Sequence, residues 1–257
     1  MDATLSESLC LLVDTSGPET SVALAALGGE AGTQDRMLAE RTDTRPMRHT
    51  ECLLPCVTAM LESLGLDLKS IDAVSVAAGP GSYTALRSGL SFAKGLCMAR
   101  ELPLIMVPNL EALAYSGALN ERREAAPREA PVRTWVAMRA ARRDEAYVQV
   151  FGESPTHRLL SAREPAGVAR IDTDWTRQLE DRYGNEGALR FVGDATRLVQ
   201  EAGLGAFAKT VRLDAARAAQ LLLSTGERWR ERDFSELASS VPTYLRAPFI
   251  TKAKPRL

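Results

Sequence analysis

The sequence has few of the groups on which enzymes usually depend. Among its 257 residues there are two histidines, His49 and His157, and aromatic residues make up 5% of the chain. Two isolated imidazoles provide neither a paired metal site nor a Ser, His and Asp set for acyl transfer. The residues therefore argue against a peptidase and against independent catalysis.

The chain also lacks a dominant charge and a long apolar run. Lys and Arg total 32 against 33 Asp and Glu, so no overall basic field attracts nucleic acid or an anionic membrane. Any contact with RNA would have to be local or made through a partner. The first basic residue is Arg36, which does not fit a secretory leader, and no segment approaches the roughly 20 apolar residues that cross a bilayer. We expect a cytoplasmic protein without membrane contact.

The four cysteines do not form Cys-x-x-Cys pairs. They lie in apolar segments, at Cys10, Cys52, Cys56 and Cys97. We expect buried thiols and no disulfides. One alternative is a soft-metal site, because His49, Cys52 and Cys56 would share one face of a helix, but no fourth ligand supports it.

The first half of the chain has an α/β pattern. Apolar runs predict strands at 9–13, 21–27 and 36–39, and the short loops between them favour antiparallel neighbours. The later apolar periods predict a helix over 49–64 ended by Gly65, a strand over 73–78, a helix over 82–99, a strand over 104–107 and a helix from Asn109.

A charged, proline-containing stretch at 119–131 predicts a linker between two lobes, over 1–118 and 132–257. The second half repeats the pattern less clearly. It predicts strands at 134–138, 146–151 and 189–192, and helices at 195–201 and 215–229. The tail after Glu236 contains only basic charges, at Arg246, Lys252, Lys254 and Arg256, which is more typical of a solvated end than of an RNA contact.

Two turns have the composition of phosphate-binding sites. The first places the side chains of Asp14, Thr15 and Ser16 at the end of a strand, and the second runs from Gly79 through Gly81 and Ser82 to Thr84, between a strand and a helix. Glycines allow close approach to a ligand, and the amides of a helix N-terminus favour anions. Taken alone, the first turn is more often explained by local backbone hydrogen bonds, and the second is equally well explained as a strand-to-helix turn with a capping serine.

The helix over 82–99 contains unusually many small residues. They are Ala85, Ser88, Gly89, Ala93 and Gly95. A helical glycine costs roughly 1 kcal/mol relative to alanine, so two glycines indicate that another backbone approaches closely. The approaching segment belongs either to the same lobe or to a second subunit.

Several motifs together resemble the TsaB (YeaZ) family, whose members take part in forming N6-threonylcarbamoyladenosine at position 37 of tRNA. The resemblance is dense over 9–115 and thin afterwards. It rests on Leu12-Val13-Asp14-Thr15-Ser16, His49-Thr50-Glu51-Cys52-Leu53-Leu54-Pro55, Gly79-Pro80-Gly81-Ser82-Tyr83-Thr84-Ala85-Leu86-Arg87 with Gly89, and Pro242-Thr243-Tyr244-Leu245-Arg246.

The resemblance implies an actin-like ATPase (ASKHA, ribonuclease H-like) fold of two related lobes. It implies pairing with the catalytic TsaD subunit, joint action with the ATPase TsaE, and a homodimer when the chain is alone. Contact with tRNA is then expected only indirectly or weakly. The chain itself would need no cofactor. Whether ATP or ADP binds at the interface with the partner subunit is left open by the resemblance. The implied interface lies on the helices at 49–64 and 82–99, with His49, Leu53, Val57, Ala85, Ser88, Gly89 and Ala93 as its residues.

The resemblance also implies that this chain lacks the metal of its catalytic relative. That metal is held by two histidines four residues apart, and here Leu53 stands at the second position after His49. An acid is missing as well from the stretch Ala140-Ala141-Arg142-Arg143, where the family often has Asp-Ala-Arg-Arg. The nucleotide-binding residues would then be vestigial: Asp14, Thr15, Ser16, Gly79, Gly81, Ser82, Thr84, Gly193 and Asp194.

The sequence thus predicts a non-catalytic scaffold subunit with neither a catalytic residue nor a bound metal. The alternatives are an independent actin-fold ATPase or kinase and, last, a metal-dependent glycoprotease. The scaffold hypothesis predicts that a bulky residue at Gly89 abolishes pairing and leaves the monomer folded.

Overall fold

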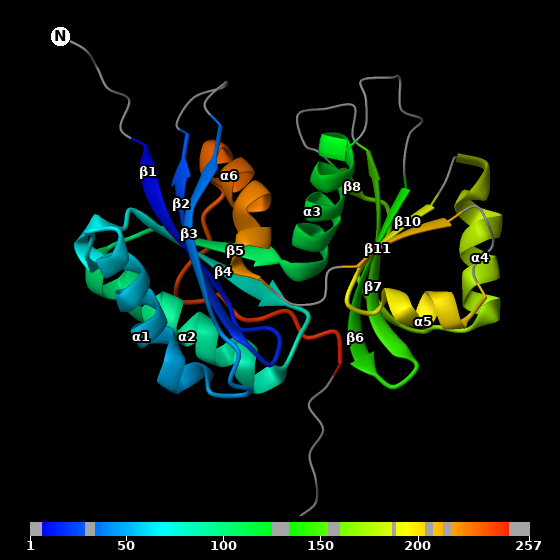
Figure 1. Ribbon diagram of the computed structural model, residues 1–257, viewed down its shortest axis with the longest axis horizontal. Coiled ribbons are helices and arrows are strands. Elements are labelled where there is room, and N and C mark those ends of the chain that lie inside the picture. Colours follow the sequence, from blue (N-terminus) through cyan, green and yellow to red (C-terminus); the bar gives the residue numbers. More distant parts are fainter. Residues whose placement is uncertain are drawn as a thin grey trace, which may run out of the picture.

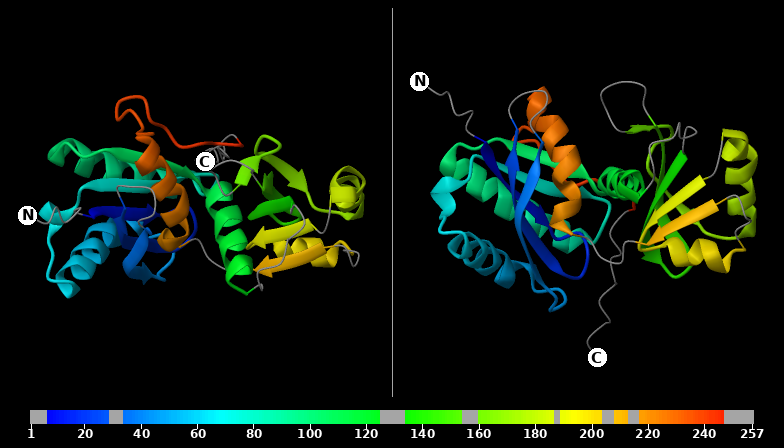
Figure 2. Two further views of the ribbon diagram at one scale, coloured as in Figure 1. Left: turned by 90° about the horizontal axis from the view of Figure 1, so that it is seen from above. Right: turned by 45° about the horizontal axis from the view of Figure 1, so that its top comes forward.

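The computed structural model describes residues 7–28, 34–124, 134–153, 160–186, 189–203, 208–212 and 217–246. Two mixed β-sheets lie side by side with helix α3 (Asn109–Glu124) between them (Figures 1 and 2). Each sheet has further helices on its outer side, so the chain folds into two lobes that share the α/β plan predicted from the sequence.

The first sheet is built from the three N-terminal strands and two crossover strands. Its order is β3-β2-β1-β4-β5, in which β1, β4 and β5 are parallel, β2 is antiparallel to β1, and β3 is antiparallel to β2. This confirms the predicted antiparallel neighbours. The strands are β1 (Ser8–Asp14), β2 (Thr20–Leu27), β3 (Arg36–Asp43), β4 (Ala73–Gly79) and β5 (Leu104–Pro108).

Helices cover both faces of this sheet. Helices α1 (His49–Ser63) and α2 (Tyr83–Arg100) pack on one face, in a core that includes Leu11, Val57 and Ala93. On the opposite face α3, the short helix η3 (Ala218–Leu221) and helix α6 (Leu222–Glu231) pack around Leu12 and Ile105. Strands buried on both faces need continuous apolar runs, which is why the sequence predicted them clearly.

The second sheet repeats the plan of the first. Its order is β11-β10-β6-β7-β8, with β9 also paired to β7, and β6, β10 and β11 are parallel while β7 is antiparallel to β6. The strands are β6 (Thr134–Arg142), β7 (Glu145–Glu153), β8 (Leu160–Ala162), β9 (Gly167–Arg170), β10 (Leu189–Gly193) and β11 (Ala208–Arg212). The same central arrangement in both sheets is the repeated unit of an actin-like fold.

The remaining elements of the second lobe cover the outer face of this sheet. Helices α4 (Thr173–Tyr183) and α5 (Thr196–Glu201) enclose a core around Phe191 and Val199. The short helices η1 (Leu68–Ser70) and η2 (Gly184–Glu186) complete the described chain. No helix among the described residues is both long and apolar enough to cross a bilayer.

The lobe boundaries differ from the prediction at two places. Residues 119–124 of the predicted linker continue α3, and the rest of the linker lies outside the described residues. The segment that begins at Ala218 was predicted to belong to the second lobe, but Ala218 and Leu221 pack against the first sheet. Figure 2 shows α6 lying against the first lobe. Composition identified the charged stretch, but it does not show which lobe a later helix packs on.

Candidate functional site

The turn after β1 uses its polar groups within the molecule. The backbone N–H and the hydroxyl of Ser16 both donate to Asp14 Oδ1, at 2.7 and 2.5 Å. The hydroxyl of Thr15 donates to the carbonyl of Ala85 on α2, at 2.6 Å. All three residues are at most 3% exposed. The turn is therefore fastened to α2 with its hydrogen bonds satisfied without a ligand.

The glycine loop packs directly on this turn. The Ser82 N–H donates to the Ser16 carbonyl at 3.1 Å, and a Cβ atom added to Gly81 would lie 2.5 Å from that oxygen. The Gly79 N–H donates to Asn109 Oδ1 at 3.0 Å. Ser82 precedes α2 as predicted, although its hydroxyl makes no capping bond, and Thr84 is exposed. Gly81 is thus required for contact between the two loops.

Arg139, which sequence reasoning missed, connects these loops to the second lobe. Its Nη1 donates to Ser16 Oγ at 2.5 Å, and its Nε lies 3.9 Å from Asp194 Oδ2. Asp194 also accepts from the N–H of Ala140, at 2.7 Å. The structure therefore brings the predicted residues Ser16 and Asp194 to one guanidinium, and Asp14 is connected to it through Ser16. The only available signal was an arginine beside the Ala140-to-Arg143 stretch, with nothing to show that it is 7% exposed.

The backbone conformation of Gly193 explains why this position is a glycine. Its φ of +128° lies in the left-handed region, and an added Cβ would collide with the carbonyl of Met138 on the neighbouring strand. Gly193 is thus required by the close approach of β10 to β6. A role for Gly193 in nucleotide binding stays a prediction.

The residues predicted for a subunit interface are mostly sealed inside the first lobe. His49, Leu53, Val57, Ala85, Gly89 and Ala93 are all buried, whereas Ser88 is half-buried. A methyl group at Gly89 would collide with Thr15 Oγ1 of the same chain. A bulky residue there is therefore expected to disturb the first lobe itself and not only the pairing. Helical periodicity identified the right helices but not which face points outward.

The outward face of the same helices forms a groove of about 570 Å³. Its walls come from α1 and α2, and they include Thr50, Leu53, Tyr83, Thr84, Arg87, Ser88, Ser91 and Phe92. Thr84 and Ser91 are exposed, and nothing lies within 4 Å of a Cβ atom added to Gly95, on the same helix. Close approach by another backbone is sterically possible here.

His49 lies at the start of α1 and is 4% exposed. Its Nδ1 shares a hydrogen bond with the Thr20 hydroxyl at 2.9 Å. Burial lowers the pKa of His49, although the negative charge of Asp14 opposes the change. Four residues later Leu53 belongs to the apolar core.

The side-chain arrangement gives no support to the alternative metal site on α1. Cys52 Sγ accepts from Arg45 Nη2 at 3.4 Å, and burial raises the pKa of the Cys52 and Cys56 thiols. Across the described part of the chain, no three His, Cys, Asp or Glu side chains gather as ligands for a metal ion. His157 lies outside the described residues.

The motif at 242–246 joins the end of the chain to both lobes. The Thr243 N–H donates to the Ala78 carbonyl at 2.8 Å. The centroids of the Tyr244 and Tyr83 rings are 4.5 Å apart. Arg246 then forms a bidentate pair with Glu145 of β7, at 2.7 and 2.9 Å. The basic residues Lys252, Lys254 and Arg256 lie outside the described residues.

The comparisons with known proteins agree with this fold. The model of the family described as "TsaD: tRNA N6-adenosine threonylcarbamoyltransferase" matches residues 39–238, more than half of the chain. The tRNA threonylcarbamoyladenosine biosynthesis protein TsaB of Haemophilus influenzae is 39% identical over 106 residues, 41% of this chain and 42% of that protein. The chain belongs to the TsaB (YeaZ) family within this group.

Other relatives of this TsaB-family chain include both a TsaB protein and a threonylcarbamoyltransferase. Escherichia coli TsaB is 35% identical over 104 residues, which cover 40% of this chain and 42% of that protein. A tRNA N6-adenosine threonylcarbamoyltransferase of Symbiobacterium thermophilum is 35% identical over 126 residues, 46% of this chain and 37% of that protein. The matches thus span less than half the length of these relatives.

The solved structure of YeaZ from Pseudomonas aeruginosa shares the fold over almost the whole chain. Its TM-score is 0.70 at 22% identity, and the match covers 93% of this chain and all of that one. The fold is therefore the actin-like α/β fold that the resemblance implied.

Proposed function

We propose that this chain is a non-catalytic subunit of the system that makes N6-threonylcarbamoyladenosine in tRNA, and that it pairs with a TsaD-type catalytic subunit. Family membership and the names of its relatives support the reaction class. ATP or ADP enters this proposal only at the interface with the partner, and TsaE joins as a further component.

The observation that carries the proposal is the burial of Leu53 in the apolar core, four residues after His49. One imidazole, already shared with Thr20, cannot hold a catalytic metal alone. The internal hydrogen bonds of Asp14 and Ser16 likewise argue against an independent kinase.

The groove between α1 and α2 is the surface proposed for the partner and, in its absence, for a second copy of this chain. Small side chains at Ser88 and Ser91 allow another helix to approach closely, and Leu54 and Met98 are exposed apolar side chains on the same two helices. Such a mixture of small and apolar groups is typical of a packed helix interface.

Mixing the chain with its TsaD partner in gel filtration tests the proposal. The wild-type chain is expected to elute as a heterodimer, whereas Ser91→Arg, which places a long charged side chain in the groove, should weaken pairing at least tenfold. Ser161→Arg is the matched control, because Ser161 is exposed in the second lobe on β8. Independent elution of both wild-type proteins would contradict the proposed pairing.

A further inference from the structure

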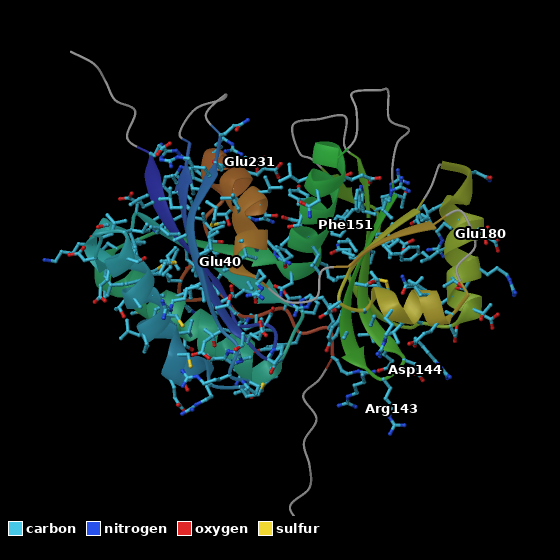
Figure 3. The ribbon with its side chains drawn as sticks, in the orientation of Figure 1. Glu40, Arg143, Asp144, Phe151, Glu180 and Glu231 are labelled. Atoms are coloured by element: carbon cyan, nitrogen blue, oxygen red, sulfur yellow. The ribbon has the colours of Figure 1, made fainter. Side chains whose placement is uncertain are left out.

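The turn between β6 and β7 concentrates positive charge on one side of the molecule. Arg142 and Arg143 are exposed there, and Figure 3 shows Arg143 projecting from the tip of the turn, beside Asp144. A hollow of about 670 Å³ opens at this place, lined by Arg142, Arg143, Asp144, Glu145, Arg170 and Arg246. Four arginines face two carboxylates, which is a local excess of two positive charges in a chain of net charge −1.

Two carboxylates at or beside the hollow have arginine partners. Glu145 binds Arg246 in the bidentate pair, and this hydrogen bond lowers the pKa of Glu145, with Arg142 and Arg170 acting in the same direction. Asp172, which lies 3.8 Å from the Nε of Arg170, also accepts from the N–H of Trp175 at the start of α4. With Asp144 also in the lining, the four arginines of the hollow still outnumber its two carboxylates.

The composition of the lining indicates the kind of ligand. Pockets for small metabolites are lined mainly by apolar and aromatic side chains with a few polar groups. Every residue that lines this hollow is charged. Such a surface suits a polyanion whose backbone remains partly hydrated, since phosphate contacts depend on charge and on the planar fork of arginine.

Aromatic side chains adjoin the basic hollow. A second hollow of about 190 Å³ shares Arg142 and Arg246 with the first, and its lining adds Tyr83, Tyr147 and Tyr244, three of the five tyrosines in the chain. The rings of Tyr83 and Tyr244 pack on each other, and the guanidinium of Arg87 lies 4.2 Å from the Tyr83 centroid. Tyr147 is half-buried and supplies a ring on which a base can stack.

We propose that the β6–β7 turn, with Arg142, Arg143, Arg170 and Tyr147, binds single-stranded RNA. The arginines contact phosphates, and a base stacks on Tyr147, which is the combination that single-strand binding surfaces use. That the surface binds nucleic acid is inferred from geometry and charge alone. The choice of RNA over DNA rests on the function proposed above.

Fluorescence anisotropy with the full chain and a labelled, unstructured RNA of about 12 nucleotides tests this inference, at salt concentrations from about 50 to 200 mM. The double variant Arg143→Ala and Arg170→Ala should bind at least tenfold more weakly. Because each phosphate contact on a single strand contributes about 0.7 to the slope of log K against log salt, the slope should fall by about 1.4.

The matched control is Arg177→Ala with Arg197→Ala. These two arginines are exposed on α4 and α5 of the same lobe, and their removal changes the net charge equally. The control should bind like the wild-type chain, whereas Tyr147→Leu should bind several-fold more weakly. Equal affinities of the double variant and its control, no binding by the wild-type chain at the lowest salt, or tighter binding of the same sequence as DNA would overturn the inference.

Pairing with TsaD, measured with the same double variant, separates this inference from the proposed function. The variant should pair at wild-type strength, because neither Arg143 nor Arg170 lines the groove between α1 and α2; Figure 1 shows where the β6–β7 turn and the two helices lie. A chain that binds RNA but does not pair contradicts the proposed function alone. A chain that pairs but shows no arginine-dependent RNA binding contradicts only the RNA surface.

Discussion

Two glycines of helix α2 have opposite environments although they lie six residues apart. Gly89 faces Thr15, whose hydroxyl is bonded to the Ala85 carbonyl, so there is no space for a side chain. Gly95 is exposed, and a Cβ atom added to it meets nothing within 4 Å. The first glycine therefore serves the core of the lobe, while the second leaves the outer face of the helix open.

Alanine at these positions should change stability in opposite directions. Gly89→Ala should lower the free energy of unfolding by roughly 1 to 3 kcal/mol, because Thr15 must move in a packed core. Gly95→Ala should raise it by about 0.5 to 1 kcal/mol, since alanine is the better helix former at an open site. Urea unfolding followed by circular dichroism measures both, and equal effects would show that Gly89 does not contact the β1 turn closely.

At the scale of elements, the first lobe could be predicted well because its strands are continuous apolar runs and its helices have clear periods. Strands 8–14 and 73–79 and helices 49–63 and 83–100 lie within a few residues of their predicted bounds. The second lobe was predicted less completely. The short strands at 160–162 and 167–170 and the polar helix at 173–183 have little apolar signal, and they were missed.

The candidate site could be predicted only in part. Asp14, Ser16 and Asp194 were identified from turn composition. Arg139, the common partner of Ser16 and Asp194, comes from another element and looks like an ordinary charged residue in the sequence. Its burial depends on the packing of β6 against the β1 turn, which local patterns do not report.

Replacement of Arg139 tests this contact between elements. Arg139→Met keeps most of the buried volume but removes the hydrogen bond to Ser16 and the charge beside Asp194. The free energy of unfolding should fall by about 1.5 to 3 kcal/mol, the usual range for a hydrogen bond to a charged group. The comparison is Arg177→Met on the exposed face of α4, which should stay within about 0.5 kcal/mol of wild type. A similar small change for both would mean that Arg139 does not join the lobes.

At the scale of the molecule, the end of the chain fastens the two lobes together. After α6, Ser235 bonds to Leu104 of β5, Thr243 bonds to Ala78 of β4, and Arg246 reaches Glu145 of the second lobe. The polar groups between the lobes are thus largely satisfied within the chain. These contacts hold the two lobes together with bonds made within the chain.

The central claim is that this chain supports the modification of tRNA through a partner and does not catalyse it. Reconstitution with tRNA, threonylcarbamoyl-adenylate, TsaD and TsaE, with nucleoside analysis of the digested tRNA, tests it most directly. The account predicts N6-threonylcarbamoyladenosine only when TsaD is present, and a yield that falls sharply when this chain is omitted or replaced by Ser91→Arg. Modified tRNA formed by this chain alone, or an unchanged yield without it, would contradict the account.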